Sequence, residues 1–335
     1  MARESWQTIA TEGGQAVLFD EVEANPRTTT AERIAQIAIE TGRDLIVAIG
    51  GGSSLEAAKA AAMLATNGGR AIDHVGQQDF AESPLPFVAI PTTCGTGSEV
   101  TWVAVLTDQD RKRKISLKGP PMFPTVALVD SDFLGSLPSR LLAATALDAL
   151  THALEATTGR RRNPISDALA EKAIVLLLEN LQGAWDGTGG AAAREAVMRA
   201  STLAGLAFGN SDVGAVHCLS ESLGGLFDLP HGLCNAVLLG PVLRAHGASI
   251  EDRLAEIDAI ANRTHTGSAE RLLGRVEGLV AAVGIPGFAS LGVEAEDHTR
   301  LAEEAVRNGS NASNPRTMEV EDYLSILQGM RSSTG

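Results

Sequence analysis

The chain has 335 residues, of which 44% are hydrophobic, and this is enough apolar material for two domains with separate cores. Its 27 basic and 41 acidic side chains give a net charge of −14, which argues against nucleic acid or an anionic membrane as the partner and favours a small-molecule substrate. The sequence has neither a signal-peptide pattern nor an apolar run of roughly twenty residues, so we expect a cytoplasmic protein that does not enter a membrane.

In the first part of the chain, short runs rich in Val and Ile alternate with Ala-rich helical patterns. This alternation predicts an α/β domain with a mostly parallel sheet wrapped by helices. The expected strands are residues 15–19, 44–50, 86–91, 99–108, 114–119 and 125–130. The expected helices are residues 31–42 and 53–69, which end at glycine. The closely spaced later strands are expected to form a local hairpin.

After about residue 136 the strand-like runs stop, and Ala- and Leu-rich segments with helical periodicity continue. Clear examples are residues 141–159, 165–185 and 194–209. We therefore expect an α/β domain over residues 1–135 and an all-helical domain over residues 136–335.

A glycine-rich turn in DLIVAIGGGSSLEAAKA follows a strand and precedes a helix, with Ser53 or Ser54 placed to cap that helix. Glycines let the backbone approach an anion, and the helix N-terminus attracts phosphate. A second small-residue loop, residues 91–101, leaves another strand, and two such loops at one sheet edge suit a diphosphate-bearing ligand. The alternative is a pair of ordinary loops, because GGGS matches neither the dinucleotide G-x-G-x-x-G nor the P-loop pattern.

Asp148 and His152 lie four residues apart on one face of an otherwise apolar helix, and a buried hydrogen-bonded pair would explain them as well as a metal site would. His217 and His231, expected on two consecutive helices, favour the metal site. One carboxylate and three imidazoles suit Fe(II) or Zn(II) better than Mg or Ca. The remaining histidines, for which a surface role is expected, are His74, His246, His265 and His298.

Together these segments resemble the iron-containing (group III) alcohol dehydrogenases over nearly the whole chain. The matching motifs, in the family's order, are GGGSSLEAAKA, PTTCGTGSEVT, FPTVALVD, ALDALTHALEA, NPISDALA, PHGLCNA and NPR at residues 314–316. The resemblance implies a dehydroquinate synthase-like fold, in which a dinucleotide-binding α/β domain precedes an all-helical metal-binding domain and the active site lies between them.

The resemblance also implies roles for particular residues. The implied metal ligands are Asp148, His152, His217 and His231. The implied diphosphate loop is Gly51, Gly52 and Ser53. The rest of the nicotinamide dinucleotide, NAD(H) or NADP(H), would be held by Thr92, Thr93, Thr96 and Lys114. Family members are often dimers, so a homodimer or a larger homo-oligomer is expected.

The chain departs from the family pattern in two places. Relatives usually begin with a strand and a helix that carry the residue that contacts the adenosine ribose, whereas only residues 1–14 precede the expected strand at residues 15–19. We expect residues 1–14 to be the end of that helix. The edge of the nucleotide site is then expected to be missing or formed differently. Many relatives also have a second histidine where this chain has Glu221. This carboxylate is predicted to relay protons, to orient a metal ligand or to bind a polar group of the substrate, and the alternative is a solvated residue without a role.

The predicted reaction is reversible hydride transfer between a small alcohol and its aldehyde or ketone, with NAD(P) as the hydride carrier and the metal polarising the substrate oxygen. Three alternatives remain open from the sequence. They are a lyase or cyclase of the dehydroquinate synthase type, a catalytically inactive scaffold protein, and a metal-free reductase of the maleylacetate type. The Asp148-x-x-x-His152 spacing favours the dehydrogenase.

Overall fold

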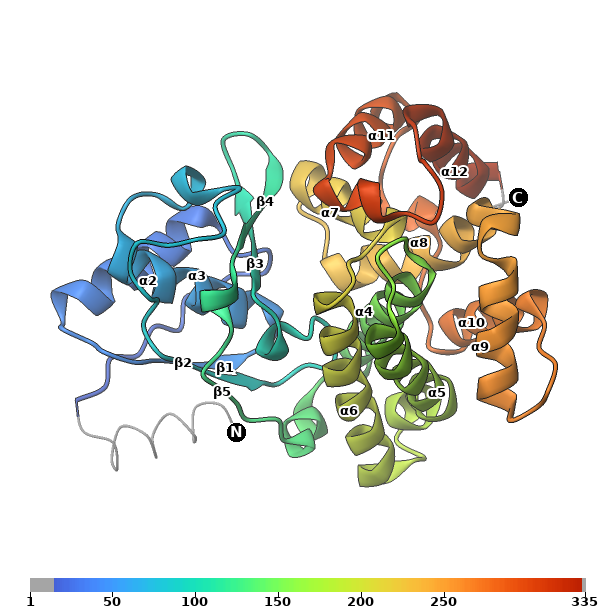
Figure 1. The fold of residues 1–335 in the computed structure, drawn as a ribbon, viewed down its shortest axis with the longest axis horizontal. Helices are drawn as coiled ribbons and strands as arrows, with labels where there is room; N and C mark the ends of the chain where they lie inside the picture. Colours follow the sequence, from blue (N-terminus) through green and yellow to red (C-terminus); the bar gives the residue numbers. More distant parts are fainter. Residues whose placement is uncertain (1–14, 333–335) are drawn as a thin grey trace. The chain divides into compact units, whose positions relative to one another are not determined.

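The computed structural model describes residues 15–332, and its helices and strands divide between two units (Figure 1). The first unit takes the chain up to Thr93 together with Ser98–Ser136. The second takes Cys94–Gly97 together with the chain from Leu137 onward. The expected helix end at residues 1–14 lies outside the described residues.

The first unit is built on a three-stranded parallel sheet with the order β1-β2-β5. The strands are β1 (Ile46–Gly50), β2 (Phe87–Pro91) and β5 (Val126–Ala127), and the helices are α2 (Thr28–Glu40) and α3 (Gly52–Asn67). One side of α3 packs on the sheet through Ala58 and Ala62, while its other side packs against α2 through Ala61 and Leu64. Burial on both sides explains why α3 is so rich in alanine.

The predicted hairpin is confirmed. Strands β3 (Val103–Asp108) and β4 (Arg113–Lys118) pair antiparallel, with Val103 opposite Lys118 and Asp108 opposite Arg113. Leu106 and Leu117 are fully buried, so the hairpin packs one face onto the same core as α3.

Other predictions for this unit are wrong in detail. Residues 15–19 form no strand, because no neighbouring strand pairs with them in residues 15–332, and Val17 and Leu18 remain about half exposed at 49% and 47%. The expected strand at residues 99–108 begins only at Val103, after a short 3-10 turn, η2 (Ser98–Val100). Neither Ser53 nor Ser54 caps α3, since Gly51 is the N-cap residue and no side chain caps it.

The second unit is helical, and residues 137–332 contain no strand. Its long helices are α4 (Ser139–Thr158), α5 (Pro164–Asp186), α6 (Gly190–Gly209), α7 (Ala215–Phe227), α8 (His231–His246), α9 (Glu251–Asn262), α10 (Ala269–Ala282), α11 (His298–Arg307) and α12 (Val320–Ser332). Helix α4 is buried on almost every side and packs against α5, α6 and α8 (Figure 1). The predicted class, a parallel-sheet domain followed by a helical domain, is confirmed.

Among the described helices, none is long and apolar enough on its own to cross a membrane. One pair of consecutive helical segments, His231–Ser249 and Glu251–Asn262, together has the length and composition of a membrane span, but the two are bent by 117° relative to each other.

Candidate active site

Helix α4 carries polar side chains on a face that is buried in the helical unit. Asp148 is 1% exposed and His152 4% exposed, one turn apart along the helix. The His152 ring stacks on Phe208 of α6 with ring centroids 4.2 Å apart, and its Nδ1 lies 3.8 Å from Asp148 Oδ1. Packing against Phe208 therefore fixes the ring beside the carboxylate.

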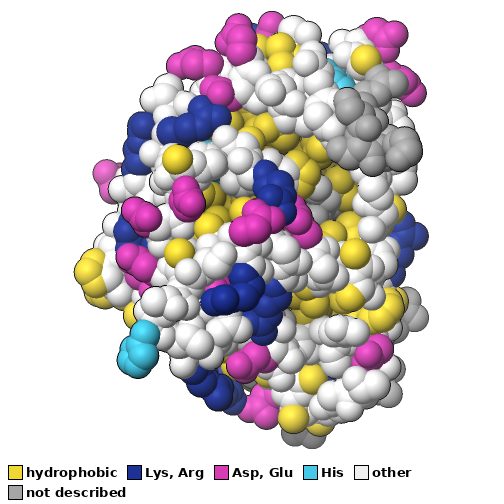
Figure 2. Space-filling view, turned by 90° about the vertical axis from the view of Figure 1, so that its right-hand side faces the viewer, with side chains coloured by type: hydrophobic (Ala, Val, Ile, Leu, Met, Phe, Trp, Pro, Cys, Tyr) yellow, Lys and Arg dark blue, Asp and Glu magenta, His cyan; other side chains and the backbone are white. Residues whose placement is uncertain are grey.

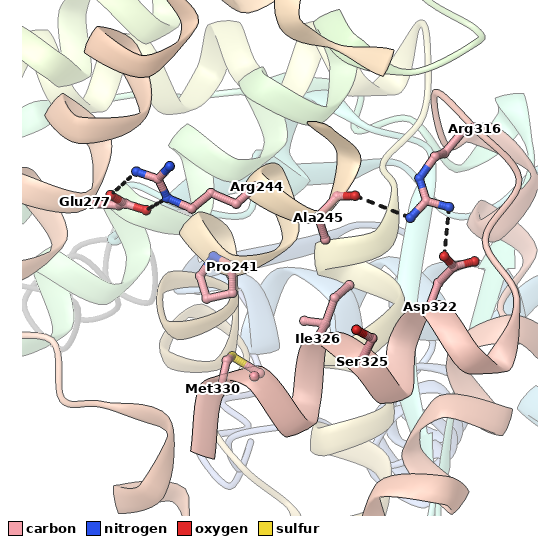
Figure 3. A pocket seen from close by; sticks show the side chains of 10 residues that line it. Pro241, Arg244, Ala245, Glu277, Arg316, Asp322, Ser325, Ile326 and Met330 are labelled. Carbon is pink, nitrogen blue, oxygen red and sulfur yellow. Dashed lines mark hydrogen bonds and ion pairs between the residues drawn. The ribbon is translucent and has the colours of Figure 1, made fainter. Parts of the chain in front are cut away.

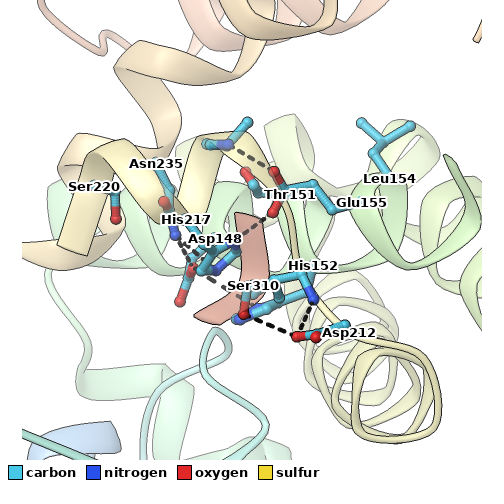
Figure 4. A network of polar contacts seen from close by, with 12 residues as sticks. Asp148, Thr151, His152, Leu154, Glu155, Asp212, His217, Ser220, Asn235 and Ser310 are labelled. Carbon is cyan, nitrogen blue, oxygen red and sulfur yellow. Dashed lines mark hydrogen bonds and ion pairs between the residues drawn. The ribbon is translucent and has the colours of Figure 1, made fainter. Parts of the chain in front are cut away.

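His217 lies in the first turn of α7, a helix whose N-cap residue, Gly214, has no side chain to cap it. The cap comes from α4 instead. Glu155 Oε1 accepts the backbone N–H of Val216 at 2.7 Å, and Glu155 Oε2 accepts Nδ1–H of His217 at 2.5 Å (Figure 4). This bond fixes a proton of His217 on Nδ1 and points Nε2 toward Asp148, with Nε2 lying 3.6 Å from Asp148 Oδ1.

His231 is the first residue of α8, directly after Pro230, whose fixed φ is compatible with a helix start. Its Nε2 lies 3.6 Å from Asp148 Oδ1, and its Nδ1 lies 3.0 Å from Ser220 Oγ of α7. One turn further along α8, the Asn235 amide donates to Asp148 Oδ1 at 2.6 Å (Figure 4). The same amide nitrogen lies 3.1 Å from His217 Nε2 and 3.2 Å from His231 Nε2.

These separations fit a shared cation. Ligand atoms at the corners of a tetrahedron are about 3.4 Å apart when each is about 2.1 Å from a central zinc-like ion. His217 Nε2 and His231 Nε2 each lie 3.6 Å from Asp148 Oδ1, and the ligand atoms of the three residues all lie within 4.8 Å of one another. His152 Nδ1, next to this group, is buried without a hydrogen-bond partner. The structure thus brings three predicted ligands together and places the fourth beside Asp148.

The electrostatics of the cluster also favour a positive charge. Although burial opposes the charged form, the carboxylates of Glu155 and Asp148 raise the pKa of His217 to about 10. Burial and the neighbouring imidazoles lower the pKa of His152 to about 3. Burial alone would raise the pKa of Asp148, but the surrounding histidines hold it below its usual range. Metal ions bind ionised carboxylates and neutral imidazoles, so a bound metal ion would take the place of the second proton of His217.

The glycine-rich turn joins the end of β1 to the start of α3. Because β1 and β2 are adjacent and parallel, Gly51 lies beside Thr93, and a Cβ on Gly51 would come within 3.1 Å of the Thr93 side chain. The Thr92 N–H donates to Gly50 O at 2.9 Å. The turn therefore places the uncapped N-terminus of a 16-residue helix at the edge of the sheet where parallel strands end.

The remaining predicted site residues are Thr96, Lys114 and Glu221. Thr96 belongs to the segment Cys94–Gly97, which groups with the helical unit. Lys114 on β4 donates to Asn25 Oδ1 at 2.7 Å. Glu221, one turn after His217 on α7, accepts a hydrogen bond from the Asn308 amide at 2.6 Å.

Comparison with known proteins identifies the family. A family model described as "Iron-containing alcohol dehydrogenase" matches residues 1–131, and one described as "Fe-containing alcohol dehydrogenase family, C-terminal" matches residues 142–330. The chain is 36% identical over 334 residues to the NAD-dependent methanol dehydrogenase of Bacillus methanolicus, covering 98% of this chain and 88% of that protein. It is also 36% identical over 322 residues to the 1,3-propanediol dehydrogenase of Klebsiella pneumoniae, covering 94% and 83%.

The chain belongs to the iron-containing alcohol dehydrogenase family. Solved structures agree: that of a 1,3-propanediol oxidoreductase matches with a TM-score of 0.93 and 34% identity over 98% of this chain and 88% of the other. That of the sulfoacetaldehyde reductase of Bifidobacterium kashiwanohense in complex with NAD+ matches with a TM-score of 0.89 and 28% identity, covering 100% and 88%. The protein is therefore a metal-dependent, NAD-linked oxidoreductase of alcohols.

In this alcohol dehydrogenase, sequence reasoning missed the residues that support the predicted ligands. Glu155 lies seven residues after Asp148, two turns along the same face of α4, and Asn235 lies one turn after His231 on α8. Their helical spacing from a predicted ligand was a usable signal, because polar residues on an otherwise apolar helix face require partners. Two of the expected surface histidines, His246 and His298, are in fact buried.

A surface pocket on the helical unit of the alcohol dehydrogenase contains none of the predicted site residues. It has a volume of about 560 Å³ and is lined by Pro241, Arg244, Ala245, Glu277, Arg316, Asp322, Ser325, Ile326, Gly329 and Met330 (Figure 3). Ion pairs between Arg244 and Glu277 and between Arg316 and Asp322 neutralise its charged walls. On the face of the molecule in Figure 2, acidic and basic side chains are mixed around hydrophobic hollows. Because the charges are already paired, we assign no substrate to this pocket.

Proposed function

We propose that this protein interconverts a small primary alcohol and its aldehyde, with Asp148, His152, His217 and His231 holding one divalent transition metal ion. The observation that carries this proposal is the 3.6 Å spacing of His217 Nε2 and His231 Nε2 from Asp148 Oδ1, in a cluster where Asp148 and His217 are buried and His231 is partly exposed. The relatives named for methanol and 1,3-propanediol support a short, uncharged alcohol as the substrate.

A metal ion bound by these residues would supply the electrophile that polarises the substrate oxygen. The protein's own groups prepare the site for it. Glu155 and Ser220 each bond Nδ1 of a histidine, so that Nε2 of His217 and His231 faces Asp148. Such outer partners fix the tautomer and the ring orientation of metal-binding histidines. Glu221, one turn after His217, is proposed to support this network or to take part in proton transfer.

For the cofactor, we propose that the diphosphate of NAD binds at Gly51, Gly52 and Ser53. The uncapped N-terminus of α3 and the absence of side-chain bulk at Gly51 and Gly52 support this assignment. We further propose that Thr92, Thr93, Thr96 and Lys114 contact the rest of the dinucleotide.

The identity of the metal, the choice of cofactor, the location and the oligomeric state are also proposals. We propose Fe(II) in preference to Zn(II), on the family's description, and NAD in preference to NADP, on the relative named for NAD and the neighbour solved with NAD+. A cytoplasmic location and a homodimer stay predictions. Elemental analysis of the purified protein would test the metal, and sedimentation equilibrium would test the oligomeric state.

The decisive test combines metal content with turnover. The apoprotein would be reconstituted with Fe(II) or Zn(II) and assayed with short aldehydes and either NADH or NADPH. In His231→Ala we expect both the bound metal and the turnover to be lost, because the ligand set falls below what tight binding needs. His265→Ala, which changes an exposed histidine, should behave like the wild type. Retention of metal and activity in His231→Ala would remove the site assignment.

A further inference from the structure

A small cavity within the helical unit lies beside Glu155, the carboxylate that bonds His217. Its volume is about 10 Å³, roughly what one water molecule needs. The residues that line it are Glu155, Thr158, Gly159, Gly214, Val216, Val242, Leu243, His246, Ser313, Asn314 and Pro315, most of them buried. The cavity is therefore bounded by the carboxylate that bonds His217, by the end of α8, and by the Asn-Pro-Arg segment that none of the proposed roles above uses.

Two residues of this wall each have a buried polar atom with no hydrogen-bond partner among the described residues. The atoms are His246 Nδ1 and Asn314 Oδ1, in side chains that are 6% and 0% exposed. The Asn314 amide nitrogen donates to Asn311 O at 3.0 Å and to Asn311 Oδ1 at 2.9 Å, which fixes which end of the amide carries the oxygen. Leaving a buried polar atom unpaired costs about 1–3 kcal/mol. Two such atoms around one cavity indicate a polar occupant.

The surroundings of Gly214 show that an Asn314 oxygen and a Glu155 oxygen lie close to the same point. A Cβ on this glycine would lie 2.8 Å from Asn314 Oδ1 and 3.1 Å from Glu155 Oε1, so both oxygens border the same small space. Both are acceptors and cannot bond each other. A group that joins them must donate two hydrogens, and a water molecule does so while accepting a third bond from His246 Nδ1–H. Three hydrogen bonds are typical of a buried water.

We propose that one water molecule is bound in this cavity, donating to Glu155 and Asn314 and accepting from His246, and that it holds the carboxylate that orients His217. The orienting part rests on the proposed metal site. The inference gives the Asn-Pro-Arg segment a role. Asn314 bonds the water, while Arg316 donates to Ala245 O near the end of α8 at 3.3 Å and pairs with Asp322 at 2.9 Å, which anchors the segment (Figure 3).

The test uses three variants of the full-length protein and Co(II) as the metal probe. His246→Phe keeps a ring of similar size but cannot bond the water, whereas His246→Asn puts an amide nitrogen near the position of Nδ1. We expect Co(II) affinity, measured by competition with a chelator, to fall about tenfold in His246→Phe and to stay near the wild-type value in His246→Asn. The Co(II) absorption spectrum should change in the same variant only. Crystal structures should show the water in the wild type and in His246→Asn.

His298→Phe is the matched control, since His298 is equally buried but contacts Phe288, outside this cavity. It should leave the Co(II) affinity and spectrum unchanged, and unfolding free energies of all variants separate a loss of fold from a loss of orientation. A wild type that binds Co(II) but has a dry cavity would overturn this inference alone, as would an unchanged affinity in His246→Phe. A wild type that binds no Co(II) would instead overturn the proposed function, and with it the orienting role of the water.

Discussion

The carboxylate of Glu155 accepts hydrogen bonds from two N–H donors of α7. Its Oε1 accepts the Val216 N–H in the first turn of α7, and its Oε2 accepts Nδ1–H of His217. The partial positive charge of the helix N-terminus favours a carboxylate at this position. A glutamine of the same shape has only one acceptor atom, so its NH₂ group would face one of the two N–H donors.

We therefore predict that Glu155→Gln lowers the affinity for Co(II) by about 10- to 100-fold, as expected for the loss of a partner that orients a metal-binding histidine. The unpaired donor should also lower the free energy of unfolding by about 1–3 kcal/mol. Chelator competition and urea unfolding measure the two effects. Glu179→Gln, which changes a carboxylate that pairs with an exposed Arg263 at 3.6 Å, is the control and should change neither value appreciably. Wild-type Co(II) binding in Glu155→Gln would contradict the assigned role.

At the scale of elements, a buried lysine joins α3 to the chain that follows β2. Lys59 is 1% exposed, and its ammonium group donates to three backbone carbonyls, Ser98 O at 2.7 Å, Thr101 O at 2.8 Å and Val103 O at 2.8 Å. Burial lowers the pKa of Lys59 to about 7. The acceptors around Nζ nevertheless match the three hydrogens of an ammonium group, which favours the charged form.

Replacing this lysine by methionine should leave those carbonyls without a donor. We predict that Lys59→Met lowers the free energy of unfolding by about 2–4 kcal/mol and speeds amide hydrogen exchange in residues 98–103. Lys172→Met, on the exposed side of α5, should stay within about 0.5 kcal/mol of the wild type. Equal stability of the two variants would show that the carbonyls find other donors.

The sequence predicted those elements whose signals are local. Hydrophobic periodicity identified α3 and α4, and the close spacing of the later strand-like runs indicated the β3–β4 hairpin. The four-residue spacing placed Asp148 and His152 on one helix face. What it did not predict depends on partners distant in the chain. Residues 15–19 have the composition of a strand but no neighbour to pair with in residues 15–332, and Glu155 acquires its role only when α7 packs against α4. Such contacts are set by tertiary packing, which periodicity alone does not encode.

At the scale of the whole molecule, His246 should make stability depend on pH. Burial lowers its pKa from 6.5 to about 4; the Arg316 charge adds to this effect, while Glu155 and Asp322 oppose it. Between pH 6.5 and 4 the unfolded chain binds a proton at this residue and the folded chain does not, so stability falls as the pH falls. The loss of unfolding free energy due to His246 is absent above about pH 6.5. It reaches about 3 kcal/mol near pH 4, at roughly 1.4 kcal/mol per pKa unit.

Unfolding free energies at several pH values between 4 and 8 would test this dependence. The variant His246→Asn cannot titrate, so it should lose this part of the slope, whereas His265→Asn, which changes an exposed histidine, should keep it. Parallel curves for the wild type and His246→Asn would show that other groups cause the acid sensitivity.

Gly214, the residue that precedes α7, has a consequence for how the protein folds. With no capping side chain at Gly214, the first turn of this helix depends on an acceptor 61 residues earlier in the chain. Starting a helix is the costly step of its formation. During synthesis, α7 should therefore stay frayed until α4 has docked against it, and His217 should reach its final orientation only late in maturation.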